Sequence, residues 1–275
     1  MLLLKKTGEL KFDIDLNKKC DIFFAMNYFG FSKYNMKKYI IEFKRKGVYV
    51  IEDSTHSILS TRAYSEESDF VVASLRKWFP IISGGICLSK IKNKHIYNKT
   101  NAEYVNKKRQ AMLEKGEYIK QNINKKNVKD NFLDKFSAAN KILKENYKNF
   151  KIDEESYNIL RNIDIRDIIK KRRRNVKIIY NYLKKQQSIR YLRDIDLEID
   201  CPIFVPIFME NTKRNEIKEY LIKNKVYCPN HWPIPEIVKE NKMKEIYNKE
   251  LSLICDQRYN EKQIEEYITL IRIRS

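Results

Sequence analysis

The stretch that decides the fold is VYVIEDSTHSILSTRAYSEESDFVVASLRKWFPIISGGICLSK, residues 48–90. It contains two short apolar runs rich in β-branched residues, Val48–Ile51 and Phe70–Ala73, and polar residues follow each run at once. Such runs are typical of strands in a parallel sheet, which are buried on both faces. A glycine pair then turns the chain into a third apolar run, Ile86–Leu88. The stretch therefore predicts the strands of an open α/β sheet.

The polar residues that follow these strands form a candidate site. Asp53 and His56 follow the first strand, and Ser74 and Lys77 follow the second. Ligands of open α/β sheets bind beyond the carboxyl ends of the strands, so we expect these four side chains to converge. Pyridoxal phosphate needs a lysine amine to hold it covalently, a carboxylate beside its ring nitrogen and a hydroxyl for its phosphate. The pattern therefore predicts a pyridoxal phosphate site, with Lys77 as the catalytic residue.

Several segments together carry a family resemblance. They are Glu52-Asp53 with His56, Ser74-Leu75-Arg76-Lys77, Gly84-Gly85, Asn27-Tyr28-Phe29-Gly30, the segment Tyr227–Pro233 and the segment Leu251–Tyr259. In type and order these residues resemble the sugar aminotransferases of the DegT/StrS type, a family of fold-type-I pyridoxal phosphate enzymes. The resemblance covers most of the chain from about Asp21 onward.

The resemblance implies a fold and a domain division. The expected fold class is α/β, with a fold-type-I PLP-transferase-like domain built as three layers around a parallel or mixed sheet, and a smaller C-terminal α+β domain. The expected domains are residues 1–160, which bind the cofactor, and 161–275, which open with a linking helix. Members of the family act as homodimers. They also carry more chain before the equivalent of Asp21, including a helix whose N-terminal turn binds the cofactor phosphate. Residues 1–19 offer no such turn, so we expect a truncated N-terminus.

The resemblance also implies a reaction. It predicts a transaminase that takes glutamate or glutamine as amino donor and a keto sugar, nucleotide-linked, as acceptor, in polysaccharide or secondary-metabolite sugar biosynthesis. Lys77 would hold the cofactor and then act as general base, and Asp53 would pair with the ring nitrogen. His231, Trp232 and Arg258 would lie near the mouth of the site as substrate contacts. The alternative is a catalytically silent relative that keeps the fold.

Periodicity and end signals predict further elements along the chain. The polar region from Lys90 to Lys148 is helix-prone. The remaining expectations are a strand at Asp21–Asn27, a helix at Ser32–Lys46 with Ser32 as N-cap and Gly47 as its stop, a helix at Asp164–Lys185, a strand at Ile203–Phe208, a helix at Arg214–Lys223, a strand at Lys225–Tyr227 and a helix at Asn260–Arg272.

The composition of the chain indicates which kinds of binding partner to expect. The net charge is +20, from 56 Lys and Arg against 36 Asp and Glu. This excess is spread along the chain, and its one dense run, Lys170–Arg174, is expected to be the solvated face of a helix. We therefore expect neither nucleic acid nor membrane as partner, although a basic nucleic-acid-binding protein stays a third hypothesis. The five cysteines are far apart and contain no C-x-x-C pair, which favours reduced thiols and a cytoplasmic protein.

Two other chemistries have partial patterns. Ser74–Lys77 also fits the S-x-x-K motif of penicillin-recognising enzymes, with K-T-G at Lys6–Gly8 and S-x-N at Ser156–Asn158. The order of these motifs is wrong, and no secretion signal accompanies them. Cys228 and His231 have a spacing that metal ligands use, but no second pair joins them. No metal is expected.

Overall fold

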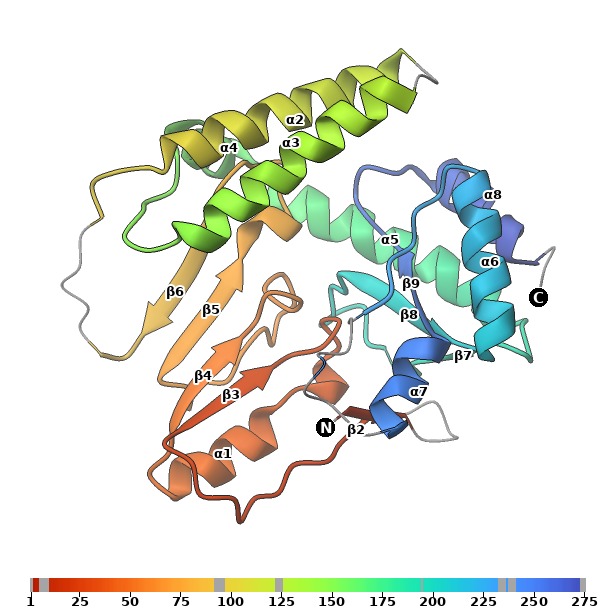
Figure 1. Cartoon of the computed structure of the whole chain (residues 1–275). Helices are drawn as coiled ribbons and strands as arrows, with labels where there is room; N and C mark the ends of the chain where they lie inside the picture. The colour runs from red at the N-terminus through yellow and green to blue at the C-terminus, as the bar shows by residue number, and fades with distance from the viewer. Residues whose placement is uncertain are drawn as a thin grey trace. The chain divides into compact units, whose positions relative to one another are not determined.

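The computed structural model of the chain describes residues 2–4, 10–91, 97–121, 126–193, 195–231, 236 and 241–272. The chain divides into two compact units, Met1–Ala73 with Asp164–Ser275 and Ser74–Ile163. Figure 1 shows the elements, which are β1 (Leu2–Leu4), β2 (Leu10–Phe12), β3 (Ile22–Met26), η1 (Ser32–Tyr34), α1 (Lys37–Arg45), β4 (Tyr49–Asp53), β5 (Phe70–Ser74), η2 (Leu75–Lys77), β6 (Gly85–Ser89), α2 (Ala102–Lys120), α3 (Lys126–Glu145), α4 (Glu154–Asn162), α5 (Ile165–Leu183), β7 (Arg190–Tyr191), β8 (Phe204–Phe208), α6 (Asn211–Lys223), α7 (Asn241–Lys249), β9 (Glu250–Ile254) and α8 (Glu261–Arg272).

The first unit holds the predicted parallel sheet. β3 pairs with β4 in parallel, and β4 pairs with β5 in parallel. The register places Met26 opposite Asp53, and Asp53 opposite Val72. α1 carries the chain from β3 back to the start of β4, which is the crossover that a parallel pair needs. The strand predicted at 21–27 and the α/β class are both confirmed.

One face of this sheet is covered within the first unit. Side chains alternate between the two faces of a strand, so Phe23, Ala25 and Val50 share a face. Ala25 and Val50 are buried in the main hydrophobic cluster with Ile40 of α1. The ring of Phe23 stacks on that of Phe43 of α1, with 4.3 Å between their centroids. α1 is therefore one outer layer of the expected three-layer arrangement.

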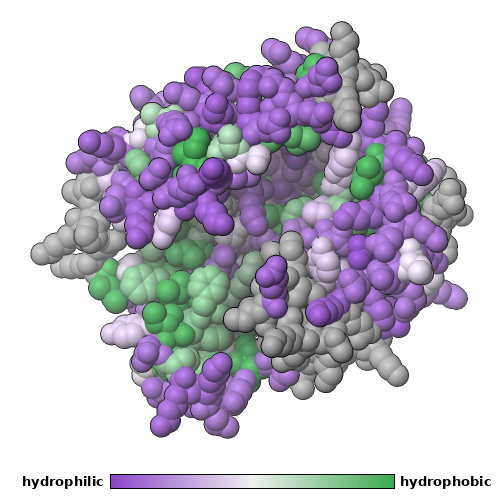
Figure 2. Space-filling view, viewed as in Figure 1, coloured by the Kyte–Doolittle hydropathy of each residue, from purple (hydrophilic) through white to green (hydrophobic). Residues whose placement is uncertain are grey.

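The opposite face of the same sheet is open at its apolar residues. Ile22, Phe24 and Tyr49 are 55%, 57% and 54% exposed. Figure 2 shows hydrophobic residues gathered on the surface over these strands. Asp53 lies on this face as well, because it is four residues from Tyr49 along β4. The open face thus runs from apolar residues at the start of the strands to a carboxylate at the end of β4.

The predicted helix at 32–46 is broken into η1 and α1, and Ser32 is not its N-cap. The N-cap of η1 is Phe31, and that of α1 is Met36. The backbone N–H of Ser32 instead donates to Asp200 Oδ1 at 2.8 Å, which holds this turn against a distant segment. The predicted stop is confirmed, since Gly47 has φ +77 just after the helix.

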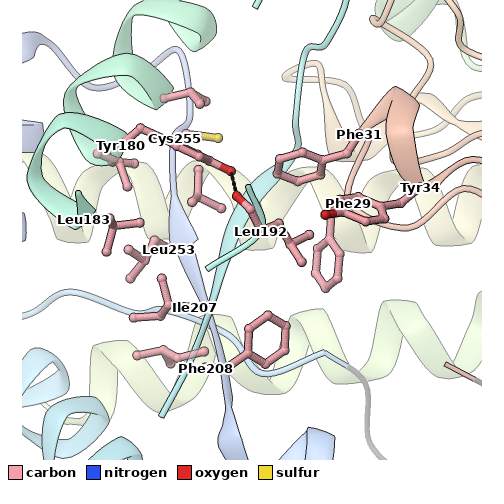
Figure 3. Packing of buried hydrophobic residues seen from close by; sticks show 14 of the residues in the cluster. Phe29, Phe31, Tyr34, Tyr180, Leu183, Leu192, Ile207, Phe208, Leu253 and Cys255 are labelled. Atoms are coloured by element: carbon pink, nitrogen blue, oxygen red, sulfur yellow. Dashed lines mark hydrogen bonds between the residues drawn. The ribbon is translucent and has the colours of Figure 1, made fainter. Parts of the chain in front are cut away.

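A second sheet of the first unit is antiparallel and buried on both faces. It has the order β7-β8-β9, and most residues of β8 and β9 are buried. Figure 3 shows this core, in which the hydroxyl of Tyr180 donates to the carbonyl of Leu192 at 2.6 Å. β8 confirms the strand predicted at 203–208, but the strand predicted at Lys225–Tyr227 is wrong. Lys225 has φ +63, because the chain turns there to leave α6.

The basic run Lys170–Arg174 lies in α5, and it is a solvated face only in part, since Lys170 is exposed but Arg172 is buried. Arg172 is buried, lies 3.6 Å from Asp256 in an ion pair, and donates to the carbonyl of Ile203 at 3.3 Å. Arg173 donates to the carbonyl of Asp200 at 3.1 Å. Carbonyl groups at the strand ends need donors, and the guanidinium groups supply them. The run therefore braces the helix against the sheet.

The second unit is mainly helical beyond β6. α2 and α3 lie side by side and confirm the helix-prone region predicted at 90–148. Every cysteine of the chain is free, as predicted. Among the described residues, no helix is both long and apolar enough to cross a membrane. The functional domains predicted at 1–160 and 161–275 stay a prediction.

Candidate functional site

Asp53 ends β4 on the open face of the parallel sheet. Its Oδ1 accepts the backbone N–H of Thr55 at 2.8 Å. Burial raises the pKa of the neighbouring Tyr28, and the charge of Asp53 raises it further. Within the described part of the chain, the Asp53 side chain makes no other hydrogen bond, so Oδ2 is available to a cationic N–H donor. This geometry fits the ring nitrogen of pyridoxal phosphate.

His56 is buried in the loop that follows Asp53. Its Nδ1 accepts the backbone N–H of Phe29 at 3.3 Å. Phe29 has φ +60, a conformation that costs a bulky residue about 1–3 kcal/mol and that gathers at functional sites. Gly30 follows at φ +88, and a Cβ there would clash with the carbonyl oxygen of His56. The Asn27–Gly30 turn is therefore shaped to hold this histidine.

The structure brings His231 to His56. Their ring centroids are 5.9 Å apart, and the ring of Phe204 lies 4.8 Å from that of His231. The two histidines come from segments 175 positions apart in the sequence, and both were candidate site residues. Asp53, His56 and His231 thus belong to one compact unit.

Two residues that support His231 were missed from the sequence. Glu250 Oε2 accepts the backbone N–H of His231 at 2.6 Å, and Ser252 Oγ lies 2.8 Å from its Nδ1. In the sequence, the segment Leu251–Tyr259 carries only a family resemblance. The signal that could have found them is the pair of polar residues at alternate positions of an otherwise apolar strand, ELSLI.

Ser74 and Lys77 belong to the second unit. Ser74 is the N-cap of η2, and Lys77 ends this turn with an exposed side chain. The turn is anchored within its unit, because Arg76 donates to the hydroxyl of Tyr104 at 2.6 Å and Trp78 is buried. In the first unit, Val72 lies opposite Asp53, and it precedes Ser74 by two residues. The meeting of Lys77 with Asp53 remains a prediction.

The structure describes Arg258 but not Trp232, the two other residues predicted to contact the substrate. Arg258 makes a bidentate pair with Asp256, with both N–O distances 3.0 Å. Burial acts to raise the pKa of Asp256, but the Arg258 hydrogen bond and the Arg172 charge lower it overall. Arg258 therefore already has a structural partner. Trp232 lies outside the described residues.

The rival chemistries find little support. In the described ranges, no group of three or more His, Cys, Asp or Glu side chains could hold a metal ion. Burial raises the pKa of Cys228 to about 12, so its thiol stays protonated. The hydroxyl of Ser156 accepts the backbone N–H groups of Ile82 and Ser83, at 2.9 and 3.2 Å, as a structural cap. The segment Lys6–Gly8 lies outside the described residues.

Comparison with known proteins gives a fold. No family model matches the sequence, and no curated protein matches it significantly. Among solved structures, the aminotransferase TlmJ from Streptoalloteichus hindustanus aligns over 91% of this chain and 64% of its own, with TM-score 0.56 and 15% identity. A DegT DnrJ EryC1 StrS aminotransferase from Brucella abortus aligns over 90% and 63%, with TM-score 0.55 and 14% identity. The PLP form of the sugar aminotransferase Spr1654 from Streptococcus pneumoniae aligns over 93% and 69%, with TM-score 0.58 and 12% identity.

The chain therefore has the fold of the fold-type-I pyridoxal phosphate aminotransferases, and its structural neighbours include a DegT DnrJ EryC1 StrS aminotransferase and a sugar aminotransferase. This confirms the predicted fold. The chain spans about 64% of the length of TlmJ.

Proposed function

We propose that the protein is a pyridoxal phosphate-dependent aminotransferase that acts on a keto sugar. The observation that carries the proposal is the position of Asp53, at the carboxyl end of β4 on the open sheet face, in a fold that the chain shares with the sugar aminotransferase Spr1654. Its second carboxylate oxygen is available to a ring N–H, within the part of the chain that the structure describes.

Each candidate residue has a role in this proposal. The cofactor, when bound, supplies an electron sink for the substrate carbon. Asp53 keeps the ring nitrogen protonated, Ser74 binds the phosphate and His56 contacts the ring. Lys77 holds the cofactor through its amine and then carries the proton from the donor carbon. His231, Trp232 and Arg258 are proposed to contact the substrate.

The finer assignments are also part of this proposal. DesI was solved with its TDP-sugar product, which supports a nucleotide-linked sugar as acceptor. Glutamate or glutamine is the proposed amino donor, and polysaccharide or secondary-metabolite sugar biosynthesis is the proposed process. A homodimer in the cytoplasm is the proposed working form. A net charge of +20 would attract a diphosphate.

A second candidate is a silent relative that keeps the fold without activity. The alignment covers 64% of TlmJ, so the activity of that whole protein is not carried over to this chain. One experiment separates the two candidates, because only the first requires a specific covalent link between pyridoxal phosphate and Lys77.

The test is borohydride trapping. The purified chain is mixed with pyridoxal phosphate, reduced, digested and mapped by mass spectrometry. We expect one equivalent of adduct on the Lys77 peptide, and its loss in Lys77→Ala. The matched control is Lys90→Ala, since Lys90 is also exposed and should not change the yield.

A basic protein can also react at many surface lysines, so stoichiometry decides the result. Adducts scattered over many peptides, with no loss in Lys77→Ala, would support the silent relative. A specific adduct with no transamination of glutamate or of glutamine would keep the cofactor site and reject the proposed amino donors.

A further inference from the structure

Glu250, Ser252 and His231 form a hydrogen-bonded chain in the first unit. The hydroxyl of Ser252 donates to Glu250 Oε1 at 2.5 Å, and Nδ1 of His231 lies 2.8 Å from Ser252 Oγ. The second carboxylate oxygen, Oε2, accepts the backbone N–H of His231 at 2.6 Å. Glu250 is 1% exposed and Ser252 is 0% exposed. A buried carboxylate thus reaches the imidazole through one hydroxyl.

The direction of these hydrogen bonds is fixed when Glu250 is ionised. A carboxylate can only accept, so Ser252 must donate its single hydroxyl proton to Oε1. The oxygen of Ser252 is then left to accept from His231, and Nδ1 must carry a proton. In the neutral ring the other nitrogen, Nε2, then has a lone pair and accepts hydrogen bonds.

One added proton changes Nε2 from a hydrogen-bond acceptor to a hydrogen-bond donor. If the proton binds Glu250, the carboxyl O–H donates to Ser252, Ser252 donates to Nδ1, and the ring proton sits on Nε2. If the proton binds the ring instead, both ring nitrogens carry hydrogen. In either case the three residues gain one proton and Nε2 changes from acceptor to donor.

The surroundings bring this change near neutral pH. Burial raises the pKa of Glu250 to about 7, although hydrogen bonds from Ser252 and His231 and the charges of Arg214 and Lys218 act to lower it. The buried Cys228 thiol stays protonated beside this group. Two other titratable groups lie at its edges: Tyr247, which faces Arg214, and His56, which faces the ring of His231.

We propose that Glu250, acting through Ser252, is a positioning residue that decides whether Nε2 of His231 donates or accepts a hydrogen bond. The role of this change in substrate binding rests on the proposed function. In the protonated state Nε2 offers a hydrogen to an oxyanion, such as a carboxylate or phosphate of the substrate. In the deprotonated state it accepts from a hydroxyl or an ammonium group.

The test is the tautomer of His231 by NMR. The chain has only three histidines, so long-range ¹H–¹⁵N spectra of ¹⁵N-histidine protein can be assigned with single histidine substitutions. At pH 8.5 we expect the proton on Nδ1 in the wild type. In Glu250→Gln the amide N–H donates to Ser252 permanently, so the proton should move to Nε2 at the same pH.

The control is Glu210→Gln, which removes an exposed carboxylate at the N-cap of α6 and should leave the wild-type tautomer. A second variant, Ser252→Ala, removes the acceptor of the Nδ1 proton and should raise the Nε2–H form, even if Glu250→Gln folds poorly. The same His231 tautomer in the wild type, in Glu250→Gln and in Ser252→Ala would overturn the proposal. No cofactor is present in this measurement, so a failed trapping of Lys77 leaves it unaffected, and the reverse also holds.

Discussion

The parallel sheet and the β7-β8-β9 sheet of the first unit are built from similar apolar strands but differ in how they are covered. β8 and β9 are almost wholly buried, whereas β3 and β4 expose alternate residues on one face. The buried sheet carries Glu250 and Ser252, which are protected from water. The half-covered sheet carries Asp53 at the end of its open face. The buried sheet therefore holds a fixed hydrogen-bond network, whereas the open face of the parallel sheet holds the proposed ligand contact.

The largest expected effect compares one residue type in the two sheets. Ile207 is fully buried in β8, and Ile22 is 55% exposed in β3. Ile207→Ala should lower the free energy of unfolding by about 2–5 kcal/mol, because it removes buried methyl groups and leaves a cavity. Ile22→Ala should lower it by about 1 kcal/mol or less. Urea unfolding of both variants measures the difference, and equal losses would mean that the open face is covered in solution.

The second effect is the pH dependence of stability. The pKa of Glu250 is about 7 in the folded chain, against an ordinary 4.5. The folded state therefore binds a proton that the unfolded state has lost, and stability falls as pH rises from about 4.5 to 7. The loss is about 3 kcal/mol. Glu250→Gln should remove this slope and be the more stable protein at pH 8. Unfolding curves between pH 5 and 8 test this, and parallel slopes for the two proteins would contradict it.

A smaller effect concerns the open face alone. Phe24 is 57% exposed, and exposed apolar patches favour association. Phe24→Ser should change the free energy of unfolding by about 1 kcal/mol or less while reducing self-association at high concentration. Sedimentation velocity over a concentration series measures the association. If the variant associates as strongly as the wild type, the open face is not the contact surface.

The smallest effect is electrostatic. The charge of Asp53 helps to raise the pKa of Tyr28. Asp53→Asn should therefore lower the pKa of Tyr28, although burial keeps it above the ordinary value. A spectroscopic titration, compared with Tyr28→Phe to identify the signal, measures the shift. An unchanged titration in Asp53→Asn would mean that the two side chains do not face each other in solution.

The sequence predicts the parallel sheet well, because β-branched runs followed by polar residues reflect local rules that tertiary contacts do not override. It fails where a long-range contact decides. Ser32 looks like an N-cap, but its N–H is taken by Asp200, 168 positions away. The sequence pattern predicts that Arg172 is solvated, but Arg172 is buried and donates to a carbonyl group distant in the sequence. The relay of Glu250, Ser252 and His231 depends on the pairing of separate segments, which no local pattern encodes. Asp53 and His56 could be predicted because both come directly after one predicted strand, so only a local pattern was needed.

The measurement that tests the central claim most directly is amide NMR of the chain during a pyridoxal phosphate titration. The open end of the parallel sheet is proposed to bind the cofactor, so the amides of Asp53, Thr55 and Tyr28 should shift with saturation, while that of Leu253 in the buried sheet should not. Asp53→Asn should weaken the saturation. Shifts that are absent, or that grow without saturation over the lysine-rich surface, would contradict the account.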